Sequence, residues 1–377
     1  MDDVVLGLAL DGIGWARPLA AELLAADPAA ADVLFDAGRY VRLADDARRA
    51  GFTFVSLDDS LGSQTGGRLE AWAHPDAVLV MARIAPVVAD IGLVATVTAT
   101  HTEPFHVSKA LATLDHVSGG RAGWQVSIST TAAEAGHVGR RPAVAPELGW
   151  QQAGEVADVV GRLWDSWEDG AVIRDVASGR FIDADRLHHV HFVGTQYSLV
   201  GPSTAPRPPQ GQLPVVVAAD QAGALVFASA AADVVVLRGG DLGDASARRT
   251  AVLAAVAAAG RDPGAVRVLA EVAVALDGVP AQAPAPRIDV AAAAFSDRMR
   301  ELAAGTGLDG FVVRLGSLDE GVRLLATASE RSDAALASPP SRGGTLRDRL
   351  GLMQPANRYA RPIGAGSSVV RAQGGLR

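Results

Sequence analysis

The sequence predicts an α/β fold, an eight-stranded (β/α) TIM barrel. Short apolar runs alternate with helical patterns along most of the chain, which is typical of a parallel sheet with crossover helices. The apolar runs number eight, as a closed barrel of parallel strands requires. Several runs end in Asp, Thr, Ser or His, and barrel enzymes gather their reactive groups at the carboxyl ends of the strands.

Each predicted strand is a short run rich in Val, Leu and Ile. The first, at residues 4–10, is almost continuously apolar, as expected of a strand that is buried on both faces. In chain order, the predicted strands are residues 4–10, 52–57, 91–98, 122–129, 214–218, 233–238, 266–276 and 310–315.

Helices are predicted between these strands. Pro104 marks one helix start, because its fixed φ and its missing N–H cost nothing in the first turn. Predicted helices occupy residues 32–50, 69–89, 104–117 and 150–167, follow the strands at 214–218 and 233–238, and resume from about residue 289.

The domain organisation is predicted to be a single barrel domain over residues 1–377. An insertion of loops and a small hairpin, at about 168–213, interrupts the alternation after the fourth helix and contains a Pro-rich segment. A C-terminal extension from about 338 to 377 is rich in Ser, Gly, Pro and Arg and is expected to be extended. Because a barrel alone needs roughly 250 residues, the chain has room for both additions.

Composition excludes several functions. A net charge of −8 without a basic cluster argues against a nucleic-acid partner. No window approaches the ~20 apolar residues that span a bilayer, and the acidic start Met1-Asp2-Asp3 is unlike a signal peptide, so we expect a cytoplasmic protein without a membrane partner. The chain has no cysteine, which excludes disulfides, thiolate nucleophiles and Cys-ligated metals. Its only lysine, Lys109, lies in a predicted helix, which disfavours Schiff-base chemistry.

The stretch at residues 91–139 is the most informative part of the chain. It predicts a buried strand, a polar loop, a helix, a tight glycine turn and a second buried strand that ends in hydroxyl groups. Its characteristic residues are Thr96, Thr98, Thr100, Pro104, Phe105, Leu114, Asp115, Ser118, Gly120, Arg121, Gly123 and Trp124.

This pattern resembles the bacterial luciferase-like flavin monooxygenases, in particular the branch that contains nitrilotriacetate and dibenzothiophene-sulfone monooxygenases. The segment LRDRLGLMQPANRYA at residues 346–360 resembles the closing motif of the same family, so the resemblance covers about residues 3–360. It implies a monooxygenase that receives reduced FMN from a separate flavin reductase and uses oxygen to oxygenate a small organic molecule. It also implies a homodimer or homotetramer.

The resemblance implies particular cofactor-binding residues. The family's aspartate after the second strand corresponds to Asp59, with Asp58 where a small residue is usual. The Thr/Ser cluster corresponds to Thr96, Thr98 and Thr100. His101 is expected to be the catalytic residue, a hydrogen-bond donor near the reactive edge of the flavin. Each residue also has a structural interpretation: the aspartates as helix caps, the threonines as strand residues, and His101 as an ordinary loop histidine.

Other positions depart from the family pattern. Gln125 stands where an asparagine is usual, Ser127 and Ser129 stand in place of a Thr-Ser pair, and Trp150 replaces a tyrosine. The serine pair that binds the flavin phosphate falls on Asp220-Gln221, where an aspartate would repel the phosphate.

Three alternatives remain open. A reduced deazaflavin could serve as a hydride donor on the same fold, or a degenerate barrel could bind flavin weakly or not at all. A metal-dependent hydrolase would need His189 and His191, two residues apart on an expected strand, to bind a metal ion. We expect no metal site, because no cysteine and no clear third ligand accompany this pair.

Overall fold

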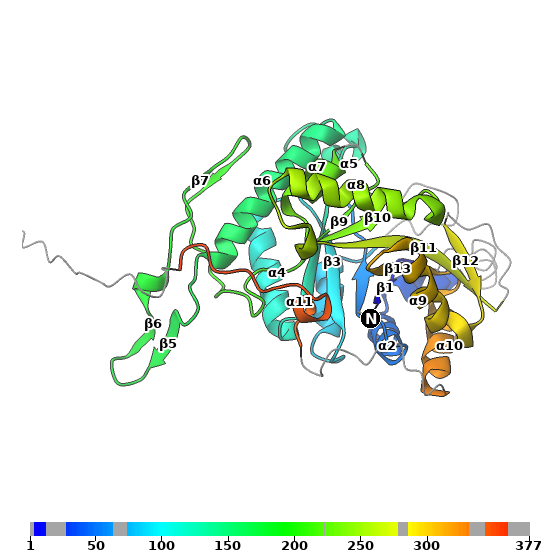
Figure 1. Cartoon of the computed structure of the whole chain (residues 1–377). Coiled ribbons are helices and arrows are strands. Elements are labelled where there is room, and N and C mark those ends of the chain that lie inside the picture. Colours follow the sequence, from blue (N-terminus) through cyan, green and yellow to red (C-terminus); the bar gives the residue numbers. More distant parts are fainter. Residues whose placement is uncertain are drawn as a thin grey trace, which may run out of the picture.

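The computed structural model describes residues 4–12, 28–62, 74–221, 223–277, 286–331 and 344–360. Its centre is a closed barrel of parallel strands (Figure 1), in which the first strand, β1, pairs with the last barrel strand, β13, and the pairing of β10 with β11 completes the ring. The predicted fold class is therefore confirmed. The barrel strands are β1 (Val5–Ala9), β2 (Phe54–Leu57), β3 (Gly92–Thr98), β4 (Ala122–Ser127), β9 (Val215–Ala218), β10 (Val234–Leu237), β11 (Arg267–Leu276) and β13 (Gly310–Leu315).

Helices surround this barrel (Figure 1). Short 3-10 turns connect several of them: η1 (Pro28–Phe35), η2 (Ala184–Arg186), η3 (Leu242–Asp244), η4 (Pro263–Ala265) and η5 (Ala292–Ala294). The α-helices are α2 (Ala37–Arg49), α3 (Ala77–Ile84), α4 (Pro104–Ser118), α5 (Ala132–Val138), α6 (Pro146–Asp165), α7 (Ala224–Ala231), α8 (Ala245–Ala258), α9 (Phe295–Thr306), α10 (Leu318–Arg331) and α11 (Leu346–Arg349). No helix in the described ranges is both long and apolar enough to cross a membrane.

Several predicted helix boundaries were wrong, and side-chain caps explain two of them. The Asp36 carboxylate accepts a hydrogen bond from Gly38 N (2.7 Å), so the regular helix begins at Ala37 rather than at residue 32. The Asp76 carboxylate accepts from Leu79 N (2.8 Å), so α3 begins at Ala77 rather than at 69; residues 69–73 lie outside the described residues. The helix predicted at 150–167 runs instead from Pro146 to Asp165.

A ninth parallel strand, β12 (Arg287–Val290), extends the sheet beyond the barrel. It pairs with the carboxyl half of β11, from Ala273 to Leu276. The helix expected from about residue 289 therefore begins only at Phe295, after the strand and a short 3-10 turn. Pairing with β11 supplies backbone hydrogen bonds that outweigh the helix propensity of the alanines that follow.

The amino-terminal end of the barrel is closed by the C-terminal segment. The fully buried Leu346 belongs to an apolar cluster with barrel residues such as Val94 and Val312. A Cβ atom at Gly92 would lie 2.6 Å from Leu346 Cδ1, and one at Gly123 would lie 3.0 Å from Leu346 Cδ2. The two glycines at the starts of β3 and β4 therefore leave the space that this leucine fills.

The helix that carries Leu346 has a capping box, which provides a test of this closure. The Thr345 hydroxyl accepts from Asp348 N (3.1 Å), and the Asp348 carboxylate accepts from Thr345 N (2.8 Å). We expect Thr345→Ala to lower the free energy of unfolding by about 1 kcal/mol, measured by urea denaturation. Thr345→Ser, which keeps the hydroxyl, should unfold at the wild-type urea concentration, and an equal loss in both variants would contradict a role for the cap.

The insertion after α6 contains two hairpins rather than the single small one predicted. β5 (Val172–Asp175) pairs with β6 (Arg180–Ile182), and β7 (Phe192–Val193) pairs with β8 (Ser198–Leu199). The insertion projects from one side of the barrel (Figure 1). The tip of the second hairpin lies against α6, where Thr195 N donates to the Glu155 carboxylate (3.0 Å).

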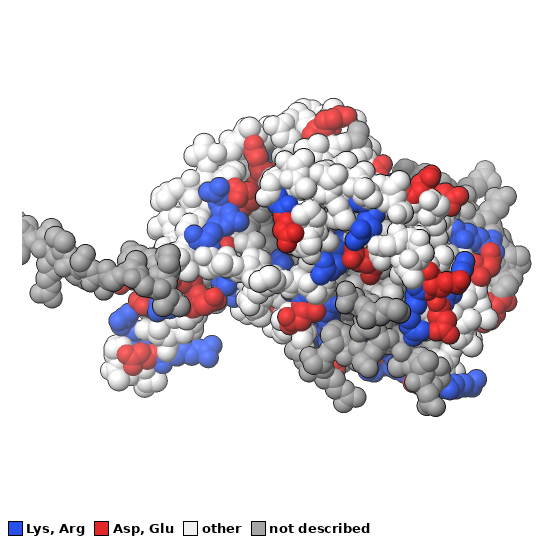
Figure 2. Space-filling model, viewed as in Figure 1, with Lys and Arg blue, Asp and Glu red and all other residues white. Residues whose placement is uncertain are grey.

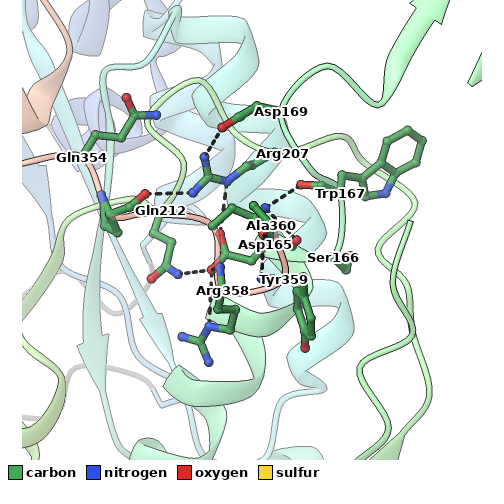
Figure 3. A network of polar contacts seen from close by, with 12 residues as sticks. Asp165, Ser166, Trp167, Asp169, Arg207, Gln212, Gln354, Arg358, Tyr359 and Ala360 are labelled. Atoms are coloured by element: carbon green, nitrogen blue, oxygen red, sulfur yellow. Dashed lines mark hydrogen bonds and ion pairs between the residues drawn. The ribbon is translucent and has the colours of Figure 1, made fainter. Parts of the chain in front are cut away.

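A buried polar network joins the end of α6, the insertion and the C-terminal segment (Figure 3). The fully buried carboxylate of Asp165 accepts from Gln212 Nε2 (2.6 Å) and Arg207 Nε (3.1 Å), and Arg358 Nε lies 3.3 Å from it. Asn357 Nδ2 donates to the backbone oxygen of Asp165 (2.9 Å). The C-terminal segment is thus held on the barrel as far as residue 360. It was predicted to be extended, but Leu346–Arg349 form the helix α11; residues 338–343 and 361–377 lie outside the described residues.

Charged side chains on the surface are mixed in sign. Acidic and basic groups alternate over the face shown in Figure 2. Many form ion pairs, such as Arg49 with Glu330 (2.7 Å) and Arg162 with Asp158 (2.8 Å). Exposed pairs of this kind contribute little to stability, so the buried networks are the more important charged groups of this fold.

Candidate active site

The carboxyl end of the barrel contains a network of five charged side chains. Arg238, after β10, pairs with Asp58, after β2 (2.8 Å), and with Glu271 of β11 (2.9 Å). Arg314 of β13 pairs with Glu271 (3.5 Å) and with Asp11, after β1 (3.0 Å). The network therefore spans the barrel from β2 to β11 and returns to β1, and it has one more acid than base.

Asp58 lies at the centre of the predicted cofactor-binding residues. Its carboxylate accepts hydrogen bonds from Gln125 Nε2 (2.5 Å), Thr96 Oγ1 (3.2 Å) and Arg238 Nη2 (2.8 Å). Burial by itself would raise the pKa of Asp58, but the guanidinium groups of Arg238 and Arg314 outweigh burial and lower it. Asp58 is therefore an ionised acceptor, which fixes the side-chain amide of Gln125 with Nε2 toward it.

Asp11 has the opposite electrostatic balance. Its carboxylate accepts from Asp58 N (2.7 Å), which ties the ends of β1 and β2 together. Burial and the neighbouring charge of Asp58 raise the pKa of Asp11 to about 6, although Arg314 acts against them. The two aspartates thus differ in their affinity for a proton.

Hydroxyl groups line the next part of the barrel mouth. Thr98 Oγ1 and Ser127 Oγ lie 3.1 Å apart on the neighbouring strands β3 and β4. Two residues further along each chain segment, Ser129 N donates to Thr100 Oγ1 (2.7 Å). Ser129 Oγ donates to the Glu134 carboxylate of α5 (3.0 Å). The predicted hydroxyl cluster is therefore brought together in space.

His101 follows β3 in a strained and buried position. Its backbone has a φ of 65°, which non-glycine residues seldom adopt, and only 6% of the residue is exposed. Both ring nitrogens are buried and have no hydrogen-bond partner among the described residues. Burial, together with the charge of Arg141, lowers the pKa of His101 below its ordinary value. The imidazole is therefore neutral at pH 7 and has one donor and one acceptor for a ligand.

The remaining predicted residues form no hydrogen bond with this group in the part of the chain that the structure describes. The Asp59 carboxylate accepts from Ala77 N (3.0 Å) and lies 3.1 Å from His74 Nδ1, so it caps the start of α3. Trp150 is buried in α6 and packs against Phe227, with ring centroids 5.3 Å apart. Asp220 and Gln221 are exposed in the turn between β9 and α7.

The charged side chains around Asp58 and around the hydroxyl cluster were not predicted from the sequence. A signal for three of them is visible in the sequence: Arg238, Glu271 and Arg314 each follow or interrupt an otherwise apolar strand. A charge at such a position must face a partner inside the barrel or the barrel mouth. Asp11 and Glu134 carry no comparable signal, because they lie in loops or at exposed helical positions where acids are common.

The predicted strand that would place His189 and His191 on one face was wrong. Residues 189–191 belong to no strand, and β7 begins only at Phe192. The two rings lie 5.5 Å apart on the surface of the insertion, and His189 Nδ1 lies 2.8 Å from Gly201 O. The described part of the chain contains no group of three His, Cys, Asp or Glu that could hold a metal ion.

The tryptophans at the end of α6 have structural roles. Trp164 Nε1 donates to Ser108 O (3.0 Å) and its ring meets that of Trp124 edge to face, with centroids 6.5 Å apart. Trp167 Nε1 donates to Ser203 O (2.8 Å). Both indoles thus join α6 to its neighbours and leave no face for a ligand.

The unsatisfied groups at the barrel mouth fit the ring of a flavin. A buried imidazole without a partner costs about 1–3 kcal/mol unless a ligand or water supplies one. The Thr98 and Ser127 hydroxyls also lie at the carboxyl end of the barrel, as does Nη1 of Arg238, which makes no hydrogen bond to a described residue. A flavin ring presents a polar pyrimidine edge and a reactive edge to such donors and acceptors.

Comparison with known proteins agrees with this geometry. Residues 19–338 match the family model described as luciferase-like monooxygenase. A subunit of the pristinamycin IIA synthase of Streptomyces pristinaespiralis is 32% identical over 86% of this chain and 92% of its own length. Nitrilotriacetate monooxygenase component A of Aminobacter aminovorans is 33% identical over 62% of this chain and 54% of its own.

The chain spans little more than half the length of the first curated relatives that it matches, between 54% and 59%. The solved structure of an EDTA monooxygenase from Chelativorans sp. BNC1 shares the fold, with a TM-score of 0.77 over 94% of this chain and 99% of that one, at 18% identity. The predicted resemblance is thus confirmed by the family match, by a relative of similar length and by the fold. The chain belongs to the luciferase-like monooxygenase family.

Proposed function

We propose that this protein is the oxygenase component of a two-component, flavin-dependent monooxygenase. It would take a reduced flavin from a separate reductase and use molecular oxygen to oxygenate a small organic substrate. FMN is the flavin that the family resemblance implies. Two relatives are named as one component of a monooxygenase and as one subunit of a synthase, which supports a system of several proteins. We also expect a cytoplasmic homodimer or homotetramer.

The observation that carries this proposal is the set of ring-binding groups at the barrel mouth. Because Gln125 Nε2 donates to Asp58, its Oε1 is turned away and can accept a ring N–H. The Thr98 and Ser127 hydroxyls can each donate or accept. Nη1 of Arg238 adds a donor whose position is fixed by the bonds of Nη2 and Nε to two carboxylates.

The neutral imidazole of His101 would contact the reacting part of the site. A reduced flavin, when bound, supplies the electrons that activate oxygen for insertion into the substrate. His101 can donate a hydrogen bond there through one ring nitrogen and accept through the other. Its burial excludes water, which protects reactive species from side reactions.

Anaerobic titration tests this function directly. The purified protein is titrated with oxidised and then with reduced FMN and riboflavin, followed by absorbance and fluorescence. We expect tight binding of a reduced flavin, and reoxidation on admission of oxygen at a rate that differs from that of the free flavin. Binding of neither flavin in either state would contradict the proposal, and binding of a reduced deazaflavin alone would favour hydride transfer on the same fold.

Substitutions in the ring-binding wall should weaken flavin binding. We expect Gln125→Ala and Ser127→Ala each to reduce the affinity for reduced flavin by about 1–2 kcal/mol, because each leaves a buried ligand group without its partner. Thr250→Ala, on the outer surface of α8, is a matched control that removes a hydroxyl far from the site. Unchanged affinity in both site variants would rule out this position for the ring.

A further inference from the structure

The turn between β9 and α7 forms the part of the site beside the ring-binding groups. β9 lies between β4, which carries Gln125, and β10, which precedes Arg238. Ala219 N donates to Val236 O (2.8 Å), so the chain stays paired up to the residue before Asp220. A ligand whose ring contacts Gln125 and Arg238 would therefore extend its tail toward Asp220 and the start of α7.

The start of α7 has no side-chain cap and lies against the buried indole of Trp150. Its N-cap, Gly223, has a φ of 85° and provides no side-chain cap for the first N–H groups of the helix. A Cβ atom at Gly223 would lie 3.2 Å from Trp150 Cδ1, the carbon bonded to Nε1. That Nε1 is buried without a partner among the described residues, and only 4% of Trp150 is exposed. The indole N–H of Trp150 is thus a buried donor without a described partner, next to the start of α7.

The charges around this turn are unfavourable for a phosphate. Asp220 is exposed and forms no ion pair with a described residue. Arg238, on the neighbouring strand, is already shared by Asp58 and Glu271. A phosphate monoester carries about 1.5–2 negative charges at pH 7 and would be repelled by the Asp220 carboxylate, because the nearby Arg238 already compensates two other carboxylates.

Neutral hydroxyl groups fit the same turn. A hydroxyl donates its proton to a carboxylate such as that of Asp220 and accepts from an N–H such as that of Trp150. The tail of riboflavin is a chain of hydroxyl groups, and FMN differs from riboflavin only by a phosphate at the end of that chain. The turn therefore suits the part that the two flavins share and opposes the part in which they differ.

We propose that this protein selects a flavin without the terminal phosphate, riboflavin, over FMN, and that Asp220 is the residue that determines this specificity. The inference rests on the proposed function, because it assumes that a flavin ring binds at the barrel mouth. It concerns only the tail, so the contribution of the ring cancels when the two flavins are compared on one protein.

The experiment compares the two flavins on three proteins. Reduced riboflavin and reduced FMN are titrated anaerobically into the wild type, Asp220→Asn and Asp220→Glu. We expect the wild type to bind riboflavin about tenfold more tightly than FMN. Asp220→Asn should improve the affinity for FMN about tenfold and change that for riboflavin by no more than about twofold. Asp220→Glu keeps the charge and should keep the preference.

The outcomes distinguish the failure of this flavin preference from the failure of the proposed function. If the wild type binds both flavins equally, or FMN more tightly, this inference is overturned while the proposed function stands. If it binds neither, both are overturned. The preference should also shrink as ionic strength rises, because an electrostatic effect at an exposed carboxylate is screened by salt. A preference that survives unchanged in Asp220→Asn would assign the specificity to another group and overturn the role of Asp220.

Discussion

Replacement of Arg238 by methionine is expected to lower the free energy of unfolding by about 3–5 kcal/mol. Methionine retains much of the volume but leaves the carboxylates of Asp58 and Glu271 without their shared cation. The side chains of Asp58 and Arg238 are each only 24% exposed, so water compensates little. Loss of one partner from such a network costs more than the network contributes as a whole. Urea denaturation at pH 7 measures the change.

Arg248 provides a matched control for this prediction. It lies ten residues away in sequence, and its donors among the described residues bond only backbone oxygens, those of Arg238 (2.9 Å) and Gly239 (2.5 Å). Arg248→Met should therefore cost no more than about 1 kcal/mol per lost hydrogen bond. The double variant Arg238→Gln/Glu271→Gln, which removes one charge of each sign, should recover part of the loss. If Arg238→Met unfolds like the wild type, the barrel-mouth ion pairs do not stabilise the fold.

The barrel strands could be predicted because each is encoded by a short, continuous run of apolar residues. A strand that is covered on both faces must be apolar throughout, and β13, at residues 310–315, has no polar side chain except that of Arg314. Strand β12 could not be predicted in this way. It lies on the edge of the sheet, alternates buried and exposed residues over four positions, and is followed by alanines that favour a helix.

The site was predictable where neighbouring strands bring residues together. Thr98 and Ser127 lie opposite each other because β3 and β4 are consecutive strands in register. The ion network was not predictable, because it depends on closure of the barrel: Arg314 and Asp11 are 303 residues apart in the sequence, and Arg238 and Asp58 are 180 apart. Pairing across such separations is a property of the three-dimensional fold, although the charges inside apolar strands do indicate that partners exist.

We expect His101→Asn to slow the reaction of the bound reduced flavin with oxygen on the order of 100-fold. The imidazole is buried, lacks a partner among the described residues and is held at a φ of 65°. Asparagine is the appropriate replacement because it tolerates this left-handed backbone, so the variant changes the chemistry without added strain. Stopped-flow absorbance after mixing the reduced complex with oxygen measures the rate.

Two further measurements separate a catalytic histidine from a structural one. Flavin affinity should change far less than the rate in His101→Asn, and the unfolding midpoint should stay close to that of the wild type.

The rate of the reaction with oxygen should also depend on the protonation state of His101, and therefore on pH. Because burial lowers the pKa of His101 below its ordinary value of 6.5, the imidazole stays neutral at pH 7 and gains a proton only at lower pH. Protonation removes its acceptor nitrogen, so the wild-type rate should change below pH 6.5 and be constant above it. That change should be absent in His101→Asn; an unchanged rate, or the same pH dependence in both proteins, would assign His101 to the structure alone.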